Sequence, residues 1–138
     1  QGNNQKAAAA FDKALSINPD NVNMLINFSR YLVQQGKLND AKKMAQRSTE
    51  IQTDNPEALA AFAWVLYKLK DYTEAKKWYH NAMNNGFANE PTTLERYGDV
   101  LFQLGETDAA IEFWRKAQQQ GAASPKLYKK IVEKTLLE

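Results

Sequence analysis

Gly36-Lys37-Leu38-Asn39-Asp40-Ala41 is the stretch that decides the fold, because its pattern of a glycine followed five positions later by an alanine returns along the chain. The pattern recurs from Gly2 to Ala7 and from Gly105 to Ala110, and a copy that ends at Ala75 has Lys70 in place of the glycine. Successive alanines are separated by 34, 34 and 35 positions. A fixed period of this length indicates a repeat protein, in which one small unit stacks on the next.

A second recurring set precedes three copies of the motif and predicts a helix there. It comprises Leu25, Phe28, Ser29 and Leu32, then Leu59, Phe62, Ala63 and Leu66, then Leu94, Tyr97, Gly98 and Leu101. Spacings of three and four residues are typical of one apolar face of a helix. Alternation with a period of two, which would indicate a strand, does not persist anywhere. We therefore expect an all-α protein of paired helices.

Small residues mark the places where paired helices should cross. Two helix backbones approach closely only where their side chains are small, and a large side chain then fills the adjacent gap. We expect Ser29, Ala63 and Gly98 to face the motif alanines of their partner helices. The bulk should come from Phe62, Tyr79, Tyr97 and Trp114.

The expected helix ends agree with this period. Proline follows a capping residue at Asn18-Pro19 and at Asn55-Pro56, where one pair should end and the next begin. The glycines expected to close helices are Gly36, Gly86, Gly105 and Gly121. Asp71 and Glu74 have the spacing of a capping box. The one extra residue before the last repeat should be absorbed in the turn 85–91.

Composition argues against several functional classes. The chain of 138 residues has no cysteine, so it has neither disulfides nor thiolate chemistry, and the redox compartment stays undetermined. His80 is the one histidine and is expected to face solvent. Carboxylates are dispersed among lysines, and no glycine-rich phosphate loop is present. We expect no enzyme activity, no metal and no cofactor.

The charge and hydropathy patterns also limit the partners. A formal charge of +2 is too small to indicate nucleic-acid binding, although lysines and arginines gather mildly at 42–47, 76–77 and 126–134. No apolar run is long enough for a membrane span, and residues 1–5 show no signal-peptide pattern, so localisation is left open and no membrane insertion is expected. The chain resembles an excised fragment of a longer protein.

The repeated residues resemble the tetratricopeptide repeat, a pattern of leucine, a small residue and an aromatic followed by Gly-x-x-x-x-Ala and a further aromatic. The resemblance implies a right-handed superhelix of about eight helices arranged as one domain. Residues 1–21 resemble the second helix of a truncated repeat, residues 22–55, 56–90 and 91–124 three full repeats, and residues 125–138 a C-terminal capping helix. Ala45, Ser48, Thr53 and Lys70 depart from the family pattern without breaking the period.

The incomplete first repeat carries its own expectation. A lone second helix would leave its apolar face, including Phe11, poorly covered. We therefore expect more repeats before Gln1 in the natural protein. The alternative is that this exposed end of the solenoid pairs with a second copy of the chain and forms a homodimer.

The resemblance further implies a concave groove lined by the first helix of each repeat. The positions that point into this groove in the family correspond here to Asn23, Ile26, Arg30, Val33, Gln34, Glu57, Ala60, Trp64, Tyr67, Lys68, Thr92, Glu95, Asp99, Phe102 and Gln103. Aromatic side chains in such a groove could clamp a peptide. Tyr67 and Phe102 occupy a position that is often aromatic for packing alone, whereas Trp64 indicates either an interaction surface or a plug between repeats.

One known use of the family groove does not match this sequence. Some of these domains hold the C-terminal carboxylate of chaperones with lysines, asparagines and an arginine, and the corresponding positions here hold Ile26, Arg30, Ala61, Thr92 and Arg96. We therefore expect no chaperone-tail binding. The leading interpretation is a scaffold that binds a peptide or a partner domain in the groove. The alternative is a structural spacer or cap of a longer solenoid.

Overall fold

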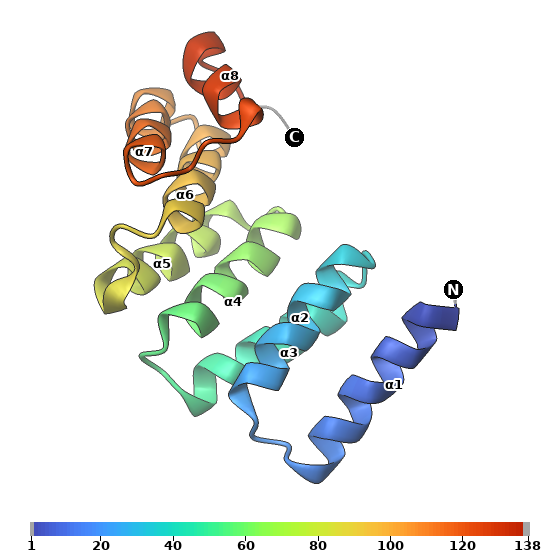
Figure 1. Ribbon diagram of the computed structural model, residues 1–138. Helices are drawn as coiled ribbons and strands as arrows, with labels where there is room; N and C mark the ends of the chain where they lie inside the picture. Colours follow the sequence, from blue (N-terminus) through green and yellow to red (C-terminus); the bar gives the residue numbers. More distant parts are fainter. Residues whose placement is uncertain (1, 137–138) are drawn as a thin grey trace.

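The computed structural model describes residues 2–136, which form helices stacked in antiparallel pairs (Figure 1). The α-helices are α1 (Gly2–Ile17), α2 (Val22–Gln34), α3 (Leu38–Ile51), α4 (Pro56–Lys68), α5 (Tyr72–Ala82), α6 (Pro91–Gln103), α7 (Thr107–Gln119) and α8 (Pro125–Glu133). A short π-helix, η1 (Met83–Phe87), follows α5. The described part of the chain contains no strand, which confirms the all-α prediction.

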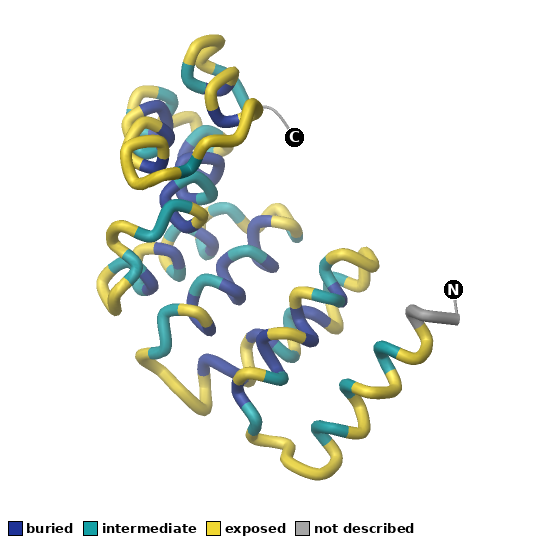
Figure 2. The backbone as a smooth tube through the Cα atoms, in the orientation of Figure 1, coloured by how far each residue is buried: buried dark blue, intermediate teal, exposed yellow. Residues whose placement is uncertain are grey.

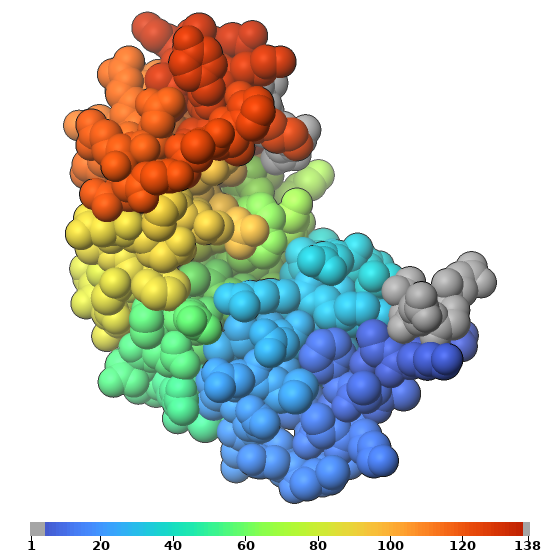
Figure 3. All heavy atoms as spheres, in the orientation of Figure 1, coloured from blue at the N-terminus to red at the C-terminus, as the bar shows by residue number. Residues whose placement is uncertain are grey.

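The helices are arranged in two layers along a curved stack. α2 packs on α3, α4 on α5 and α6 on α7, while α1 and α8 lie at the two ends of the stack. The first helices α2, α4 and α6 also contact one another in succession. Buried positions lie where helices face their neighbours, and exposed positions face outward (Figure 2). The space-filling view shows the stack bending around an open side between its blue and red ends (Figure 3).

The motif alanines lie at the crossings of the paired helices, as predicted. Ala41, Ala75 and Ala110 have no exposed surface. At the crossing of α6 and α7, a Cβ atom built on Gly98 would lie 2.5 Å from Cδ1 of Trp114 and 3.1 Å from the carbonyl oxygen of Ala110. That crossing therefore admits only glycine without rearrangement.

The first helices end in the same way in all three repeats. Each end has a backbone N–H bonded to the carbonyl five residues earlier at 2.9 Å, in the pairs Lys37 to Leu32, Asp71 to Leu66 and Glu106 to Leu101. This closure needs one residue in the left-handed conformation. Gly36 supplies it with φ 75°, and Lys70 adopts φ 67° at the position where the family glycine is missing.

The extra residue of the last spacing is accommodated between α5 and α6. η1 contains Asn85 and Gly86, whose φ angles of −110° and 122° are not helical. The helix is therefore broken at Asn85 and Gly86, inside the predicted turn 85–91, where an extra residue costs little. The prediction that the insertion falls in this turn is confirmed.

α1 is covered more than the sequence suggested. Phe11 is half-buried, and its ring stacks on Phe28 of α2 with centroids 4.8 Å apart. Ile17, at the end of the same helix, is 77% exposed. The pairing of this end with a second copy of the chain stays a prediction.

Candidate functional site

Two hollows lie side by side on the surface formed by the first helices. Hollow A, of about 430 Å³, lies among α2, α4 and α6 and reaches down to α5. Hollow B, of about 330 Å³, lies among α4, α6 and α8. Trp64, Thr92 and Arg96 line both hollows and so form the ridge between them.

The ridge is a stack of aromatic and cationic side chains. The Trp64 ring stacks on Tyr67 with centroids 5.3 Å apart and planes 9° from parallel. The Arg96 guanidinium lies 3.8 Å from the centre of the Trp64 ring, and the Lys68 ammonium lies 4.7 Å from it. Contacts between a cation and an aromatic face contribute about 0.5–2 kcal/mol, so these side chains hold one another in place. Trp64 therefore links α4 to α6 through its contact with Arg96.

Hollow A contains two arginines and two glutamates with different surroundings. Glu90 caps α6: its carboxylate accepts hydrogen bonds from the backbone N–H groups of Thr92 and Thr93 and from Oγ1 of Thr93. Partial burial opposes ionisation of Glu90, but these hydrogen bonds and the charge of Arg96 outweigh it and lower the pKa of the carboxyl group. Glu90 is thus an anion already engaged by the start of α6.

The arginines of hollow A are not engaged in that way. Arg30 is exposed and Arg96 half-buried. Among residues 2–136, neither guanidinium forms an ion pair with a carboxylate. Glu57, the other acidic side chain of the hollow, is exposed at the start of α4.

Tyr79 of α5 also lines hollow A. This residue has no exposed surface, and no group of the described chain accepts the proton of its hydroxyl. Burial raises the pKa of the Tyr79 phenol, and the positive charge of Arg96 together with hydrogen bonding from its guanidinium only partly opposes the effect. Tyr79 therefore stays a neutral hydrogen-bond donor, and leaving such a donor unsatisfied costs about 1–3 kcal/mol.

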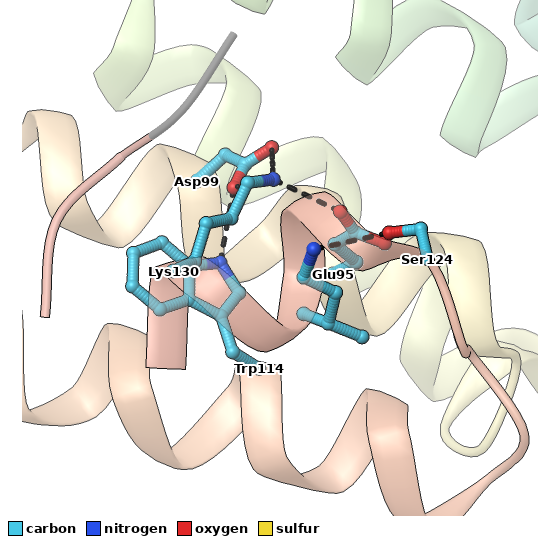
Figure 4. A network of polar contacts seen from close by, with 6 residues as sticks. Glu95, Asp99, Trp114, Ser124 and Lys130 are labelled. Carbon is cyan, nitrogen blue, oxygen red and sulfur yellow. Dashed lines mark hydrogen bonds and ion pairs between the residues drawn. The ribbon is translucent and has the colours of Figure 1, made fainter. Parts of the chain in front are cut away.

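The next repeat shows the same position with its polar atom satisfied. Trp114 of α7 stands 35 residues after Tyr79, one repeat later, and is equally buried. Its Nε1–H donates to Oδ1 of Asp99 at 3.0 Å, and the Lys130 ammonium of α8 donates to the same carboxylate at 3.0 Å and to Glu95 at 2.9 Å (Figure 4). α8 thus inserts a basic side chain above the last repeat and ties it to α6.

The charges of hollow B follow from this network. Burial raises the pKa of Asp99 to about 6, although the attraction of Lys130 and hydrogen bonds from Lys130 and Trp114 oppose the rise. Burial tends to lower the pKa of Lys130, but its pairing with Asp99 and Glu95 outweighs burial and raises it. Lys130 therefore stays charged and bound, whereas Lys68, Lys126 and Arg96 line the hollow without a carboxylate ion pair among the described residues.

Ten of the fifteen predicted groove residues line these hollows. They are Arg30, Val33, Glu57, Ala60, Trp64, Tyr67, Lys68, Thr92, Glu95 and Asp99. Asn23, Gln34 and Gln103 are exposed and Phe102 is half-buried, but all four lie outside both hollows.

Ile26 is placed differently from the prediction. It is 1% exposed and packs with Val22, Ala58 and Ala61, because the neighbouring helix α4 closes over this position. The expectation that Ile26 points into the groove is therefore wrong. Tyr67 and Asp99 line hollow B but are 5% and 7% exposed, so they form its wall from below.

Several residues of the site were not among the predicted ones. The sequence predicts only a packing role for Tyr79, and it places Lys126 and Lys130 in a capping helix with a mild basic cluster. The two lysines are four residues apart, which places them on one face of α8, and this spacing is a signal that could have indicated a second role. The sequence holds no comparable signal for the unsatisfied hydroxyl of Tyr79.

Two further findings concern the described residues. No group of three or more histidine, aspartate or glutamate side chains in residues 2–136 could hold a metal ion. Among the helices that the structure describes, none combines the length and the apolar character needed to cross a membrane.

Comparison with known proteins identifies the repeat. A family model for the tetratricopeptide repeat matches residues 1–61, and a model for subunit 3 of the anaphase-promoting complex, or cyclosome, matches residues 34–117. A tetratricopeptide repeat-containing protein of Dictyostelium discoideum is 23% identical over 118 residues. The match covers 81% of this chain and 45% of that relative, so the chain spans less than half of the relative's length.

Solved structures share the fold at low identity. A crystal structure of MamA is similar with a TM-score of 0.83 and 22% identity, covering 96% of this chain and 77% of that chain. YrrB is described as a tetratricopeptide-repeat protein with an unusual peptide-binding site. Its structure matches with a TM-score of 0.73 and 24% identity, and the match covers 83% of this chain and 58% of YrrB. The first repeat domain of Spaghetti, solved with an HSP90 peptide, matches with a TM-score of 0.76 and 15% identity. The match covers 82% of this chain and 89% of that domain. The repeat period, the stacked helix pairs and the family-model matches together show that the chain belongs to the tetratricopeptide-repeat family.

Proposed function

We propose that the chain binds a peptide segment of another protein along the surface that contains hollows A and B. The observation that carries this proposal is the continuity of the two hollows across the ridge of Trp64, Thr92 and Arg96. A segment lying along the first helices would cross the ridge and place side chains in both hollows. Spaced pockets for side chains are how grooves of this kind recognise peptides.

The composition of the surface supports a protein ligand. Aromatic and arginine side chains supply most of the binding energy at protein interfaces, and the ridge presents Trp64 and Arg96 together. The ridge is also rigid before binding, since the two side chains contact each other and Tyr67 stacks beneath them. A rigid surface lowers the entropic cost of association. Peptide binding by YrrB and by the Spaghetti domain makes the same use of the fold reasonable here.

The test uses a substitution that fills the groove without touching the core. Thr92 is exposed, lies in the first turn of α6 and lines both hollows, so Thr92→Trp should block them. Thr73 occupies the same position in the first turn of α5 but lines neither hollow, and Thr73→Trp is the matched control. Both sites are exposed, so both variants should melt close to the wild-type temperature.

The experiment selects short random peptides displayed by a phage library on the immobilised 138-residue chain. We expect selected peptides to bind the wild type and the Thr73→Trp variant with equal affinity and to lose binding to Thr92→Trp. Peptides that bind both variants equally would contradict the proposal. Failure to select any peptide would favour the structural alternative, in which the segment is a spacer or cap of a longer solenoid.

A further inference from the structure

The unsatisfied hydroxyl at the base of hollow A indicates what the hollow binds. Tyr79 is wholly buried and lines the hollow, and its hydroxyl proton has no acceptor within residues 2–136. More than nine in ten buried polar groups in proteins have a partner, so each exception needs an explanation. A phenol that stays neutral, as burial ensures here, offers its proton to an acceptor.

The groups around Tyr79 narrow the chemistry of that acceptor. Arg96 lies close enough to affect the ionisation of Tyr79, and its guanidinium has no carboxylate partner among the described residues. The Glu90 carboxylate is engaged by the first turn of α6 through three hydrogen bonds. Arg30 adds a second cation at the side of the hollow. The groups near Tyr79 that lack a carboxylate partner among the described residues are thus Arg96 and Arg30, and a half-buried cation without a counter-ion favours an anion.

The following repeat shows how a carboxylate can bind at the equivalent place. At the equivalent position Trp114 donates to Asp99, which in turn binds Lys130 of α8. The carboxylate there lies between an aromatic donor of a second helix and a cation. Hollow A has the aromatic donor, Tyr79, and the cation, Arg96, but the chain places Trp64 where Asp99 stands one repeat later. Of the three groups found in the next repeat, hollow A therefore lacks only the carboxylate.

We propose that hollow A binds an aspartate or glutamate side chain of the partner peptide, whose carboxylate accepts hydrogen bonds from the Tyr79 hydroxyl and the Arg96 guanidinium. This inference rests on the proposed function and adds the chemical class of the residue recognised. It differs from capture of a peptide's C-terminal carboxylate by the first helices, since the specific donor comes from the second helix α5. Glu57 at the start of α4 opposes a second negative charge, so one acidic residue is expected in this hollow.

The peptides come from the display selection described above, in which each peptide is fused at its C-terminus and carries carboxylates only on side chains. We expect the selected sequences to share one aspartate or glutamate at a fixed distance from an apolar residue. Synthetic peptides with an amidated C-terminus then report affinity by fluorescence anisotropy. Replacing the shared acidic residue by its amide should weaken binding by about tenfold, because a charge-assisted hydrogen bond is replaced by a neutral one.

Two protein variants locate the acceptor. Tyr79→Phe should weaken the acidic peptide about tenfold and should leave the amide peptide little affected, so that the two changes are not additive. Tyr97→Phe, a change at another buried tyrosine that lies away from both hollows, should leave both affinities unchanged. In the absence of peptide, Tyr79→Phe should melt at or above the wild-type temperature, because it removes an unsatisfied group.

The outcomes separate this inference from the proposed function. Selected peptides that lose binding to Thr92→Trp but share no acidic residue would overturn the inference and leave groove binding intact. Additive effects of Tyr79→Phe and the amide substitution would overturn it as well, and so would a lower melting temperature of Tyr79→Phe without peptide. The same peptides synthesised with a free C-terminal carboxylate form a second arm: much tighter binding of this form, with no remaining effect of the acidic side chain, would assign the anion to the C-terminus and would also overturn the inference.

Discussion

Gly98→Ala tests the packing of the stack at its tightest point. The added Cβ would lie 2.5 Å from Cδ1 and 2.6 Å from Nε1 of Trp114, and 3.1 Å from the carbonyl oxygen of Ala110. The carbonyl is backbone, and the indole is fixed by its hydrogen bond to Asp99, so neither group can move freely. Overpacking costs about 1–3 kcal/mol, and contacts as short as these should lie in the upper part of that range, at about 2–3 kcal/mol. Alanine regains about 1 kcal/mol of helix propensity.

We therefore expect Gly98→Ala to lower the free energy of unfolding by about 1–2 kcal/mol, which corresponds to a melting temperature lower by about 3–8 °C. The assay is thermal unfolding followed by circular dichroism. The matched variant is Ala63→Gly at the equivalent, wholly buried position of α4, which should also destabilise, because there alanine is the residue that fits. A Gly98→Ala variant that melts at or above the wild-type temperature would refute the packing described here.

Four further predictions follow from individual contacts. Asp99→Asn should gain stability relative to the wild type as the pH rises from 4 to 6, measured by urea unfolding, because a carboxyl whose pKa is raised to about 6 in the folded state binds its proton more tightly there than when unfolded. Lys130→Ala should cost about 3 kcal/mol, because two carboxylates lose their buried partner. Lys76→Ala, which breaks only an exposed ion pair, should cost less than about 1 kcal/mol in the same urea titration. Lys70→Gly should raise the melting temperature and stabilise by about 0.5–1 kcal/mol, because glycine adopts the positive φ of this helix end without strain.

The repeat period was sufficient to predict the stack, because the same physical requirement recurs in every repeat. Ala41, Ala75 and Ala110 are wholly buried as expected, and the glycine at 36 and the lysine at 70 close their helices with the same backbone geometry. Each of these features depends on residues close in sequence or one period apart. Such local rules can be read from a single chain.

The site was predicted only in part, because its chemistry depends on contacts between repeats. Ile26 is covered by residues of α4, and no residue near it in sequence indicates that cover. Arg96 lies over Trp64 from 32 positions away, and Lys130 reaches Asp99 from 31 positions away. The family pattern predicts which way a side chain points from its own helix. It does not predict which side chains of the neighbouring helix cover it.

The hydroxyl of Tyr79, which has no acceptor, is a second feature that the sequence could not predict. Phe11, Tyr79 and Trp114 stand at one position of the repeat, four residues after the motif alanine, and the sequence predicts only bulk for Tyr79 and Trp114. In the structure one ring stacks on α2, one donates to a carboxylate and one has no acceptor in the described chain. Only the surroundings of each ring distinguish a packing residue from a binding one.

The most direct test of groove binding is a two-dimensional ¹⁵N–¹H spectrum of the labelled chain, recorded while a selected peptide is added. The chain has three tryptophans, and each gives one indole N–H resonance. Trp64 forms the ridge between the two hollows, whereas Trp78 lies on α5 and lines neither of them. Peptide binding in the groove predicts a large shift of the Trp64 indole resonance with little change at Trp78. A shift of the Trp78 resonance alone, with the Trp64 resonance unchanged, would place the partner on the second helices of the pairs and would contradict the proposed function.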